Sequence, residues 1–329
     1  MHWGLVGPGG IAHRFADALA TRPDARLHRV VGRSPERTRA FASRWQAEPG
    51  TELGAMLADP AIDAVYIATP HSAHAEIASA CLRAGKAVLC EKPLAASQAQ
   101  AQALVATAHD RGVFLMEALW TRYLPALRAA EAWLIDRRIG PIRALQSSFG
   151  FHVPFDAAHR VYAPELAGGA LLDIGIYNLS LSQWVMALQG VDEPPAIQAM
   201  GVLAPTGVEQ RCAVQMQYAD RTLSQFTCAF DSLHDNWLRI YGEHGRIELG
   251  PRCWEPTQAT LHRHGEPSQQ VQAPFAHNGF EYQIDAAMAA IRGGAVEEPR
   301  MPHRQTLAVL RQIDELRREL GTVRLSHET

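Results

Sequence analysis

The chain has 329 residues, 47% hydrophobic and 20% charged, with a formal net charge of −3. This length exceeds the usual size of one hydrophobic core, so we expect two domains. The small net charge gives no electrostatic reason to expect nucleic acid or an anionic membrane as a partner.

Cysteine usage and the start of the chain bear on the compartment. The five cysteines are scattered, without a CxxC pair, which is typical of reduced thiols rather than of disulfides or a zinc site. No apolar run is long enough to span a membrane, and no signal-peptide pattern precedes the first strand. We therefore expect a cytoplasmic protein that has no membrane partner.

Up to about residue 120, short apolar strands alternate with helical stretches. The strands read "WGLVG", "LHRVVGR", "AVYIAT", "AVLCEKP" and "VFLMEA". The helices between them include one with a Ser34-Pro35 start and one that Ser97 can cap. Strands separated by helices in this way predict an α/β domain with a doubly wound parallel sheet over residues 1–120.

From about residue 140 the chain reads as consecutive strands with short links. They are "IRALQSSFGFHV", "AIQAMGVLA", "CAVQMQYA", "RTLSQFTCAF", "WLRIYGEHG" and "RIELG". Short links indicate antiparallel pairing, hence an open sheet with one face on the core. Two helices close the chain, "FEYQIDAAMAAIRGG" and "HRQTLAVLRQIDELRREL". We assign residues 121–329 to this second α/β domain, whose last helix is also suited to docking on the first.

A glycine pattern follows the first strand. Gly7, Gly9 and Ala12 form GxGxxA at the start of a helix, with Gly10 and Ile11 between them. This pattern is typical of dinucleotide binding, since Gly7 allows a tight turn, Gly9 lets backbone approach a pyrophosphate, and the helix start offers free N–H groups. A glycine-rich turn that binds nothing is the alternative.

The end of the second strand indicates which dinucleotide binds. An acidic residue about 20 residues after the glycines would hold the ribose of NAD, but this region has Arg33, Ser34 and Arg37. Guanidinium groups grip a 2′-phosphate well, so the sequence favours NADP, with NAD as the second choice. A solvated basic helix start is the alternative.

A lysine and an acid–phenol pair are the candidate catalytic groups. Lys92 follows an apolar strand at the sheet edge where ligands bind, and Pro93 restricts its backbone. Asp173 and Tyr177 lie four residues apart, on one face of an apolar helix that follows Gly168 and Gly169. Taken alone, these residues read as a surface lysine, a helix-start carboxylate and a core tyrosine.

A series of motifs runs along residues 4 to about 291, in the order GxGxxA, "TPHSAHAE", "CEKPLA", "MEALWTRYLP", "GGALLDIGIY" and "NGFEYQIDAAMAAI". In this order the motifs resemble the Gfo/Idh/MocA family of NAD(P)-dependent oxidoreductases. Within the family they look most like dimeric trans-dihydrodiol dehydrogenases and NADP-dependent D-xylose dehydrogenases. The resemblance implies a Rossmann domain, then an α/β domain whose open sheet forms the oligomer contact.

Site residues carry over from the family by position. Lys92 matches the catalytic lysine, and Tyr177 stands where many members have histidine and where the dihydrodiol branch has its proposed acid/base tyrosine. A phenol titrates near 10 in water, so we expect Lys92 to activate Tyr177 and Asp173 to orient the lysine. His74 matches a family histidine near the nicotinamide. The cofactor set also includes Thr69, Pro70, His71, Glu91, Trp120 and Arg122.

The substrate side is predicted in outline. Phe151, His152 and Phe155 would form an apolar wall, and Arg160 would line the pocket with Asp173 and Tyr177. Arg122 would bind the cofactor or the substrate, or would hold the two domains together. We expect no metal, because no carboxylate or cysteine joins His71 and His74 locally.

The function implied is hydride transfer between NADP and a carbinol carbon of a sugar, polyol or cyclic diol. The alternative is a regulatory protein of the same fold that binds NADP and sugar without turnover. We also expect one face of the second sheet to be apolar and too large to leave in water, so that it forms a homodimer or tetramer.

Overall fold

The computed structural model describes residues 1–323. The chain divides into two compact units, the first made of residues 1–120 with 276–307 and the second of residues 121–275 with the chain from residue 308 on. Residues 276–307 therefore pack with the N-terminal unit, although their place in the sequence suggested the second domain. Among the helices of residues 1–323, none is long and apolar enough to cross a membrane.

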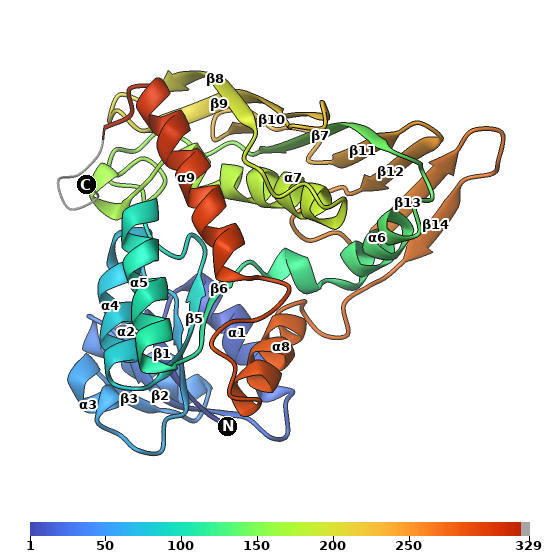
Figure 1. Ribbon diagram of the computed structural model, residues 1–329. Helices are drawn as coiled ribbons and strands as arrows, with labels where there is room; N and C mark the ends of the chain where they lie inside the picture. Colours follow the sequence, from blue (N-terminus) through green and yellow to red (C-terminus); the bar gives the residue numbers. More distant parts are fainter. Residues whose placement is uncertain (324–329) are drawn as a thin grey trace. The chain divides into compact units, whose positions relative to one another are not determined.

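The N-terminal unit contains a parallel sheet of six strands in the order β3-β2-β1-β4-β5-β6 (Figure 1). Their bounds are β1 His2–Val6, β2 Arg26–Val31, β3 Glu48–Gly50, β4 Ala64–Ile67, β5 Ala87–Glu91 and β6 Leu115–Ala118. β4, β5 and β6 are buried throughout, as is most of β1, which explains why these strands read as continuous apolar runs rather than as alternating ones. The expected Rossmann architecture is confirmed.

Five helices connect these strands, namely α1 Gly10–Ala20, α2 Pro35–Arg44, α3 Leu53–Leu57, α4 His74–Arg83 and α5 Gln98–Arg111. The later helix α8, Glu281–Arg292, also belongs to this unit. The predicted caps are present, since the Oγ atoms of Ser34 and Ser97 each accept a hydrogen bond from the backbone N–H three residues on. α1 packs beside α8, and α4 beside α5. The short β3 and α3 escaped sequence analysis, because neither carries a periodic pattern.

The strand order contains one reversal, between β1 and β4. From β1 the chain moves outward to β2 and β3, whereas β4, β5 and β6 run outward on the other side. In open parallel sheets, ligands bind at the carboxyl ends of the strands where this reversal occurs. Val6 pairs with Ile67, so the loops beginning at Gly7 and Ala68 leave the sheet side by side.

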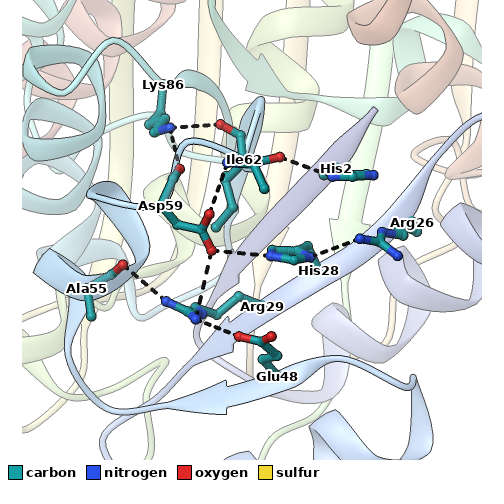
Figure 2. Close-up of polar contacts among 10 residues, drawn as sticks. His2, Arg26, His28, Arg29, Glu48, Ala55, Asp59, Ile62 and Lys86 are labelled. Atoms are coloured by element: carbon teal, nitrogen blue, oxygen red, sulfur yellow. Dashed lines mark hydrogen bonds and ion pairs between the residues drawn. The ribbon is translucent and has the colours of Figure 1, made fainter.

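A polar cluster lies toward the amino ends of the parallel strands, around the loop that follows α3 (Figure 2). Asp59 accepts hydrogen bonds from the Ala61 N–H and from His28 Nε2, and Arg29 lies 3.8 Å away. Lys86 Nζ donates to the carbonyls of Asp59 and Ile62. The Ala61 N–H, with help from His28 and Arg29, lowers the pKa of Asp59. The cluster stabilises the amino ends of the strands, whereas the Gly7 loop lies at their carboxyl ends.

The second unit has a mixed, mainly antiparallel sheet of eight strands in the order β14-β13-β12-β11-β7-β10-β9-β8. Their bounds are β7 Ile142–Gly150, β8 Ala196–Leu203, β9 Glu209–Gln217, β10 Leu223–Ala229, β11 Leu238–Gly242, β12 Gly245–Leu249, β13 Gln258–Arg263 and β14 Gln269–Gln272. β13 and β14 were not predicted. β7 pairs in parallel with β10, because the chain leaves β7 on a long excursion before the β8–β9–β10 meander returns to it. The short links correctly predicted only the antiparallel pairs.

The outer face of this sheet is not the apolar surface that the sequence suggested. Gln198, Gln215, Gln225 and Gln146 face one another in register across four strands and are exposed. Apolar residues of the same strands, such as Val214 and Phe226, point inward. The strand segments are rich in apolar residues, but alternation directs most of those residues to the core.

Three helices complete the second unit. Their bounds are α6 Pro125–Ile135, α7 Ile176–Leu188 and α9 His303–Glu319, the last of which begins among residues of the first unit. α6 was not predicted. α7 is buried almost all round, as its apolar composition requires, and a single π-helical turn over Leu171–Gly175 leads directly into it.

Candidate active site

The Gly7 loop has the form that a pyrophosphate requires. Gly7 has φ +92°, and a Cβ there would lie 2.7 Å from the carbonyl oxygen of Ala68. At Gly9 and Gly10 no described atom lies within 4 Å of the place a Cβ would take, and no described side chain caps α1. The backbone is therefore open to a close ligand, and the first N–H groups of the helix face it. Ile11 is exposed beside them, whereas Ala12 is buried where helix and strand pack.

The end of β2 presents basic groups. Arg33 and Arg37 are exposed, and between them Ser34 caps α2 by accepting a hydrogen bond from the Arg37 N–H at 3.4 Å. Because Ser34 Oγ acts as an acceptor there, its hydroxyl hydrogen can be donated to an anion. The chemistry of this donor set fits a 2′-phosphate.

β5 ends at Glu91, and Lys92 follows it. Tyr66 donates a hydrogen bond to Glu91, and the Tyr66 ring stacks on Phe15 of α1 with ring centroids 3.8 Å apart. Burial raises the pKa of Glu91 to about 7. The Glu91 side chain thus lies in the unit's interior, while Lys92 is half-buried at the carboxyl edge of the sheet.

His74 links the loop after β4 to the loop after β5 at this edge of the sheet. Its Nδ1 lies 2.7 Å from the Pro93 carbonyl and its Nε2 2.9 Å from the Thr69 carbonyl. The ring is completely buried, and burial lowers its pKa. His74 therefore fixes the loop of Thr69 and Pro70 against the Lys92–Pro93 segment. The ring of His71 lies edge-on to it.

Trp120 and Arg122 are packed inside their own units. The Trp120 ring contacts Phe280, with centroids 5.0 Å apart, and the guanidinium of Arg14 packs on both rings, 4.2 Å from that of Trp120. Arg122 is buried and donates to the Oγ and the carbonyl oxygen of Ser180 in α7, each at 2.9 Å from Nη2. Both residues therefore have packing partners within their own units, and their contact with a cofactor stays a prediction.

In the second unit, the predicted acid and phenol lie on consecutive helical turns. Asp173 is in the π-turn and Tyr177 at the start of α7, and both are buried. Arg160 Nη1 donates to Asp173 Oδ1 at 3.1 Å, and the Arg160 side chain is 55% exposed. The charge of Asp173, with a smaller contribution from Tyr177, raises the pKa of Arg160. An acid, a phenol and a partly exposed cation are therefore neighbours.

Aromatic rings extend from Tyr177. Phe149 lies 5.6 Å from the Tyr177 ring and stacks face to face on Trp254, with centroids 3.6 Å apart. The Phe151 ring lies tilted beside Phe149, with centroids 5.9 Å apart, and Phe155 is exposed farther along the same excursion of the chain. Sequence analysis named Phe151 and Phe155 as candidates, a prediction that still stands untested, and did not name Phe149 or Trp254. Phe149 reads as an ordinary core position of a strand, and Trp254 lies in a loop that has no motif.

Comparison with known proteins matches both units to one family. Residues 1–119 match the model of the Gfo/Idh/MocA oxidoreductase family, NAD-binding Rossmann fold, and residues 127–248 match the Gfo/Idh/MocA C-terminal domain. Human trans-1,2-dihydrobenzene-1,2-diol dehydrogenase is 33% identical over 335 residues, covering 98% of this chain and 97% of the human protein. The same enzyme from Danio rerio is 32% identical over 332 residues, with 98% of each chain covered.

Solved structures also resemble the whole chain. The 3-ketoreductase KijD10 from Actinomadura kijaniata, in complex with NADP and TDP-benzene, is 28% identical and superposes with a TM-score of 0.84 over 97% of this chain and 98% of its own. An aldose-aldose oxidoreductase from Caulobacter crescentus, complexed with glycerol, is 26% identical with a TM-score of 0.87 over 99% of each chain.

Proposed function

Because this chain belongs to the Gfo/Idh/MocA family of NAD(P)-dependent oxidoreductases, we propose that it is an NADP-dependent dehydrogenase acting on a CH–OH group. The observation that carries the proposal is the turn of helix that places Tyr177 just beyond the buried Asp173, with Arg160 hydrogen-bonded to that acid. A regulatory protein would have no need of these groups.

NADP, rather than NAD, is the proposed cofactor. Gly7, Gly9 and the uncapped start of α1 would hold the pyrophosphate, and Arg33, Ser34 and Arg37 the 2′-phosphate. The nicotinamide end of the cofactor would lie against the loop of Thr69, Pro70 and His71, which His74 holds in place. The solved structure of a related ketoreductase contains NADP, which supports this choice.

The proton is the part of the reaction that this chain's own residues would move. When bound, the nicotinamide accepts or supplies the hydride. In oxidation, Tyr177 takes the proton of the substrate hydroxyl, and in reduction it returns that proton to the carbonyl oxygen. Lys92 is the proposed cation that favours the ionised phenol, and Asp173 orients the cationic groups. Arg160 is the cationic group that the second unit itself supplies to Asp173.

The proposed substrate is a small cyclic diol, polyol or sugar. Phe149 and Trp254 give the surroundings of Tyr177 an apolar, aromatic character, which suits the flat face of a ring. Arg160 adds a donor fork suited to hydroxyl or carbonyl oxygens. The names of the relatives, a dihydrobenzenediol dehydrogenase and an aldose-aldose oxidoreductase, cover the same range of substrates.

A panel of substrates tests the proposal. The purified chain is mixed with NADP⁺ and aldoses, polyols or trans-cyclohexadiene diols, and with NADPH and the corresponding carbonyl compounds, while NADPH absorbance is followed. We expect turnover with at least one member. Tight binding of NADP together with no turnover in either direction would instead favour the regulatory alternative.

We also propose a homodimer or tetramer formed through the outer face of the second sheet. Met200, Val202 and Leu223 are large apolar side chains exposed on its strands, near the glutamines in register. Such a face would associate through side-chain amides and a few apolar contacts rather than through a broad apolar surface.

A further inference from the structure

Gly169, four residues before Asp173, has room for no side chain. Its φ is +118°, and a Cβ there would overlap Oε2 of Glu209. Its N–H donates to the Val161 carbonyl at 2.9 Å, and its carbonyl accepts from the Asp173 N–H at 3.1 Å. The position of this one residue therefore determines where the Arg160–Val161 segment and the π-turn of Asp173 meet.

Glu209 is the side chain that closes this position. It is the first residue of β9 and is fully buried. Its Oε1 accepts a hydrogen bond from Thr322 Oγ1 at 2.7 Å and lies 3.2 Å from Nε of Arg317, which is also buried. Its Oε2 receives no hydrogen bond from the described residues and points at Gly169 instead.

Burying these charged groups costs free energy of folding. A buried ion pair is often no more stabilising than well-packed apolar residues of the same volume, and an unsatisfied carboxylate oxygen adds to the cost. What the ion pair provides is a fixed direction, because Arg317 and Thr322 hold one oxygen while the other abuts the Gly169 backbone. Small displacements of catalytic groups can lower rates greatly, which makes such a fixed contact useful here.

We propose that Glu209, held by Arg317 and Thr322, is a positioning residue that sets the place of Asp173 and, one turn on, of Tyr177. This inference rests on the proposed roles of Asp173 and Tyr177. Glu209 acts through the Gly169 backbone and contacts neither substrate nor cofactor. The double glycine in "GGALLDIGIY" serves the same purpose, since a Cβ at Gly168 would lie 2.8 Å from the Val161 carbonyl oxygen.

Two sets of variants test the proposal. Glu209→Ala with Arg317→Met removes the carboxylate without leaving a buried charge unpaired. Thr322→Val loosens the carboxylate but keeps the ion pair, and Thr322→Ser restores the hydroxyl. On a substrate found by the panel, we expect the double variant to lower kcat by about 10- to 100-fold, with KM and the Kd of NADP within about twofold of native. Thr322→Val should lower kcat several-fold, and Thr322→Ser should recover it.

Ile247→Val, buried in β12 of the same sheet, serves as the matched control. It should lower the melting temperature while kcat stays native. If the double variant and Thr322→Val keep native kcat although Tyr177→Phe is inactive, the positioning role is wrong and the proposed function stands. If Tyr177→Phe is fully active as well, the proposed relay itself is wrong. If the double variant does not fold, Thr322→Val and Thr322→Ser decide the question.

Discussion

Arg160 donates a hydrogen bond to Asp173 across 3.1 Å, joining a half-exposed cation to a carboxylate that is only 4% exposed. A buried carboxylate needs such a partner, because its charge is poorly solvated. The exposed part of the guanidinium remains available to oxygens of a ligand. Asp173 is thus held within its own unit, beside Tyr177, whatever else approaches it.

This pair predicts a graded loss of activity. Arg160→Met should lower kcat by about 10- to 100-fold, the typical worth of a charge-assisted hydrogen bond, and Arg160→Lys should recover part of it. Arg83→Met, at an exposed arginine in the last turn of α4, is the control and should behave as native. Steady-state kinetics measure all three. Native kcat in Arg160→Met would show that the cation near Asp173 has no part in turnover.

Cofactor choice is tested at the end of β2. NADP should bind more tightly than NAD. Arg33→Ala should lower the ratio of the NAD and NADP dissociation constants by about tenfold, because a charged hydrogen bond to the 2′-phosphate is lost. Arg39→Ala, an exposed arginine farther along α2, should change little. Calorimetric titration of both dinucleotides decides between them. Tighter binding of NAD by the unmodified chain would contradict the assignment.

Glu91 predicts a pH dependence of stability. Its pKa is about 7 in the folded protein, above the ordinary carboxyl value of 4.5, so the folded state binds the extra proton between these values. The free energy of unfolding should therefore fall as pH rises from about 4.5 to 7, by at most about 3 kcal/mol. The side chain in Glu91→Gln cannot titrate, so its free energy of unfolding should not fall over this pH range. At pH 8 the variant should therefore have gained stability relative to the native chain.

The measurement is denaturant unfolding of the unliganded chain at pH 5 and pH 8. Glu76→Gln, an exposed carboxylate on α4, is the control and should differ from native equally at both pH values. If Glu91→Gln also differed from native by the same free energy of unfolding at pH 5 and pH 8, Glu91 would be ionised at both pH values.

Assembly is tested by light scattering at micromolar concentration. We expect a dimer or tetramer, and we expect Gln225→Glu with Leu223→Glu to shift it to the monomer, because like charges would meet across a symmetric contact. Thr257→Glu, exposed on the loop before β13, is the control. A native chain that is already monomeric would refute the proposed assembly.

Sequence alone predicted the parallel sheet, because buried strands and capped helices leave local signals such as Ser34 before Pro35. It also placed Asp173 and Tyr177 on one helical face, since their spacing is local. It could not predict that Arg160 binds Asp173, that Glu209 abuts Gly169 or that Trp254 stacks on Phe149, because these partners come together only through the tertiary fold. The glutamines of the outer face were misjudged, because counting apolar residues ignores which side of the strand they occupy.

The central claim is that Tyr177 carries the proton. Tyr177→Phe removes only the phenol oxygen and keeps the ring that packs on Phe149, so folding and NADP binding should stay native. Lys92→Met should cost at least as much activity, and the double variant no more than the worse single one, since groups acting as a unit are not additive.

The direct measurement is kcat of Tyr177→Phe, with its Kd for NADP, beside the native chain on the same substrate. The account predicts a fall in kcat of on the order of 10²–10⁴-fold with an unchanged Kd. A kcat within about twofold of native would contradict it and leave the phenol as a packing residue.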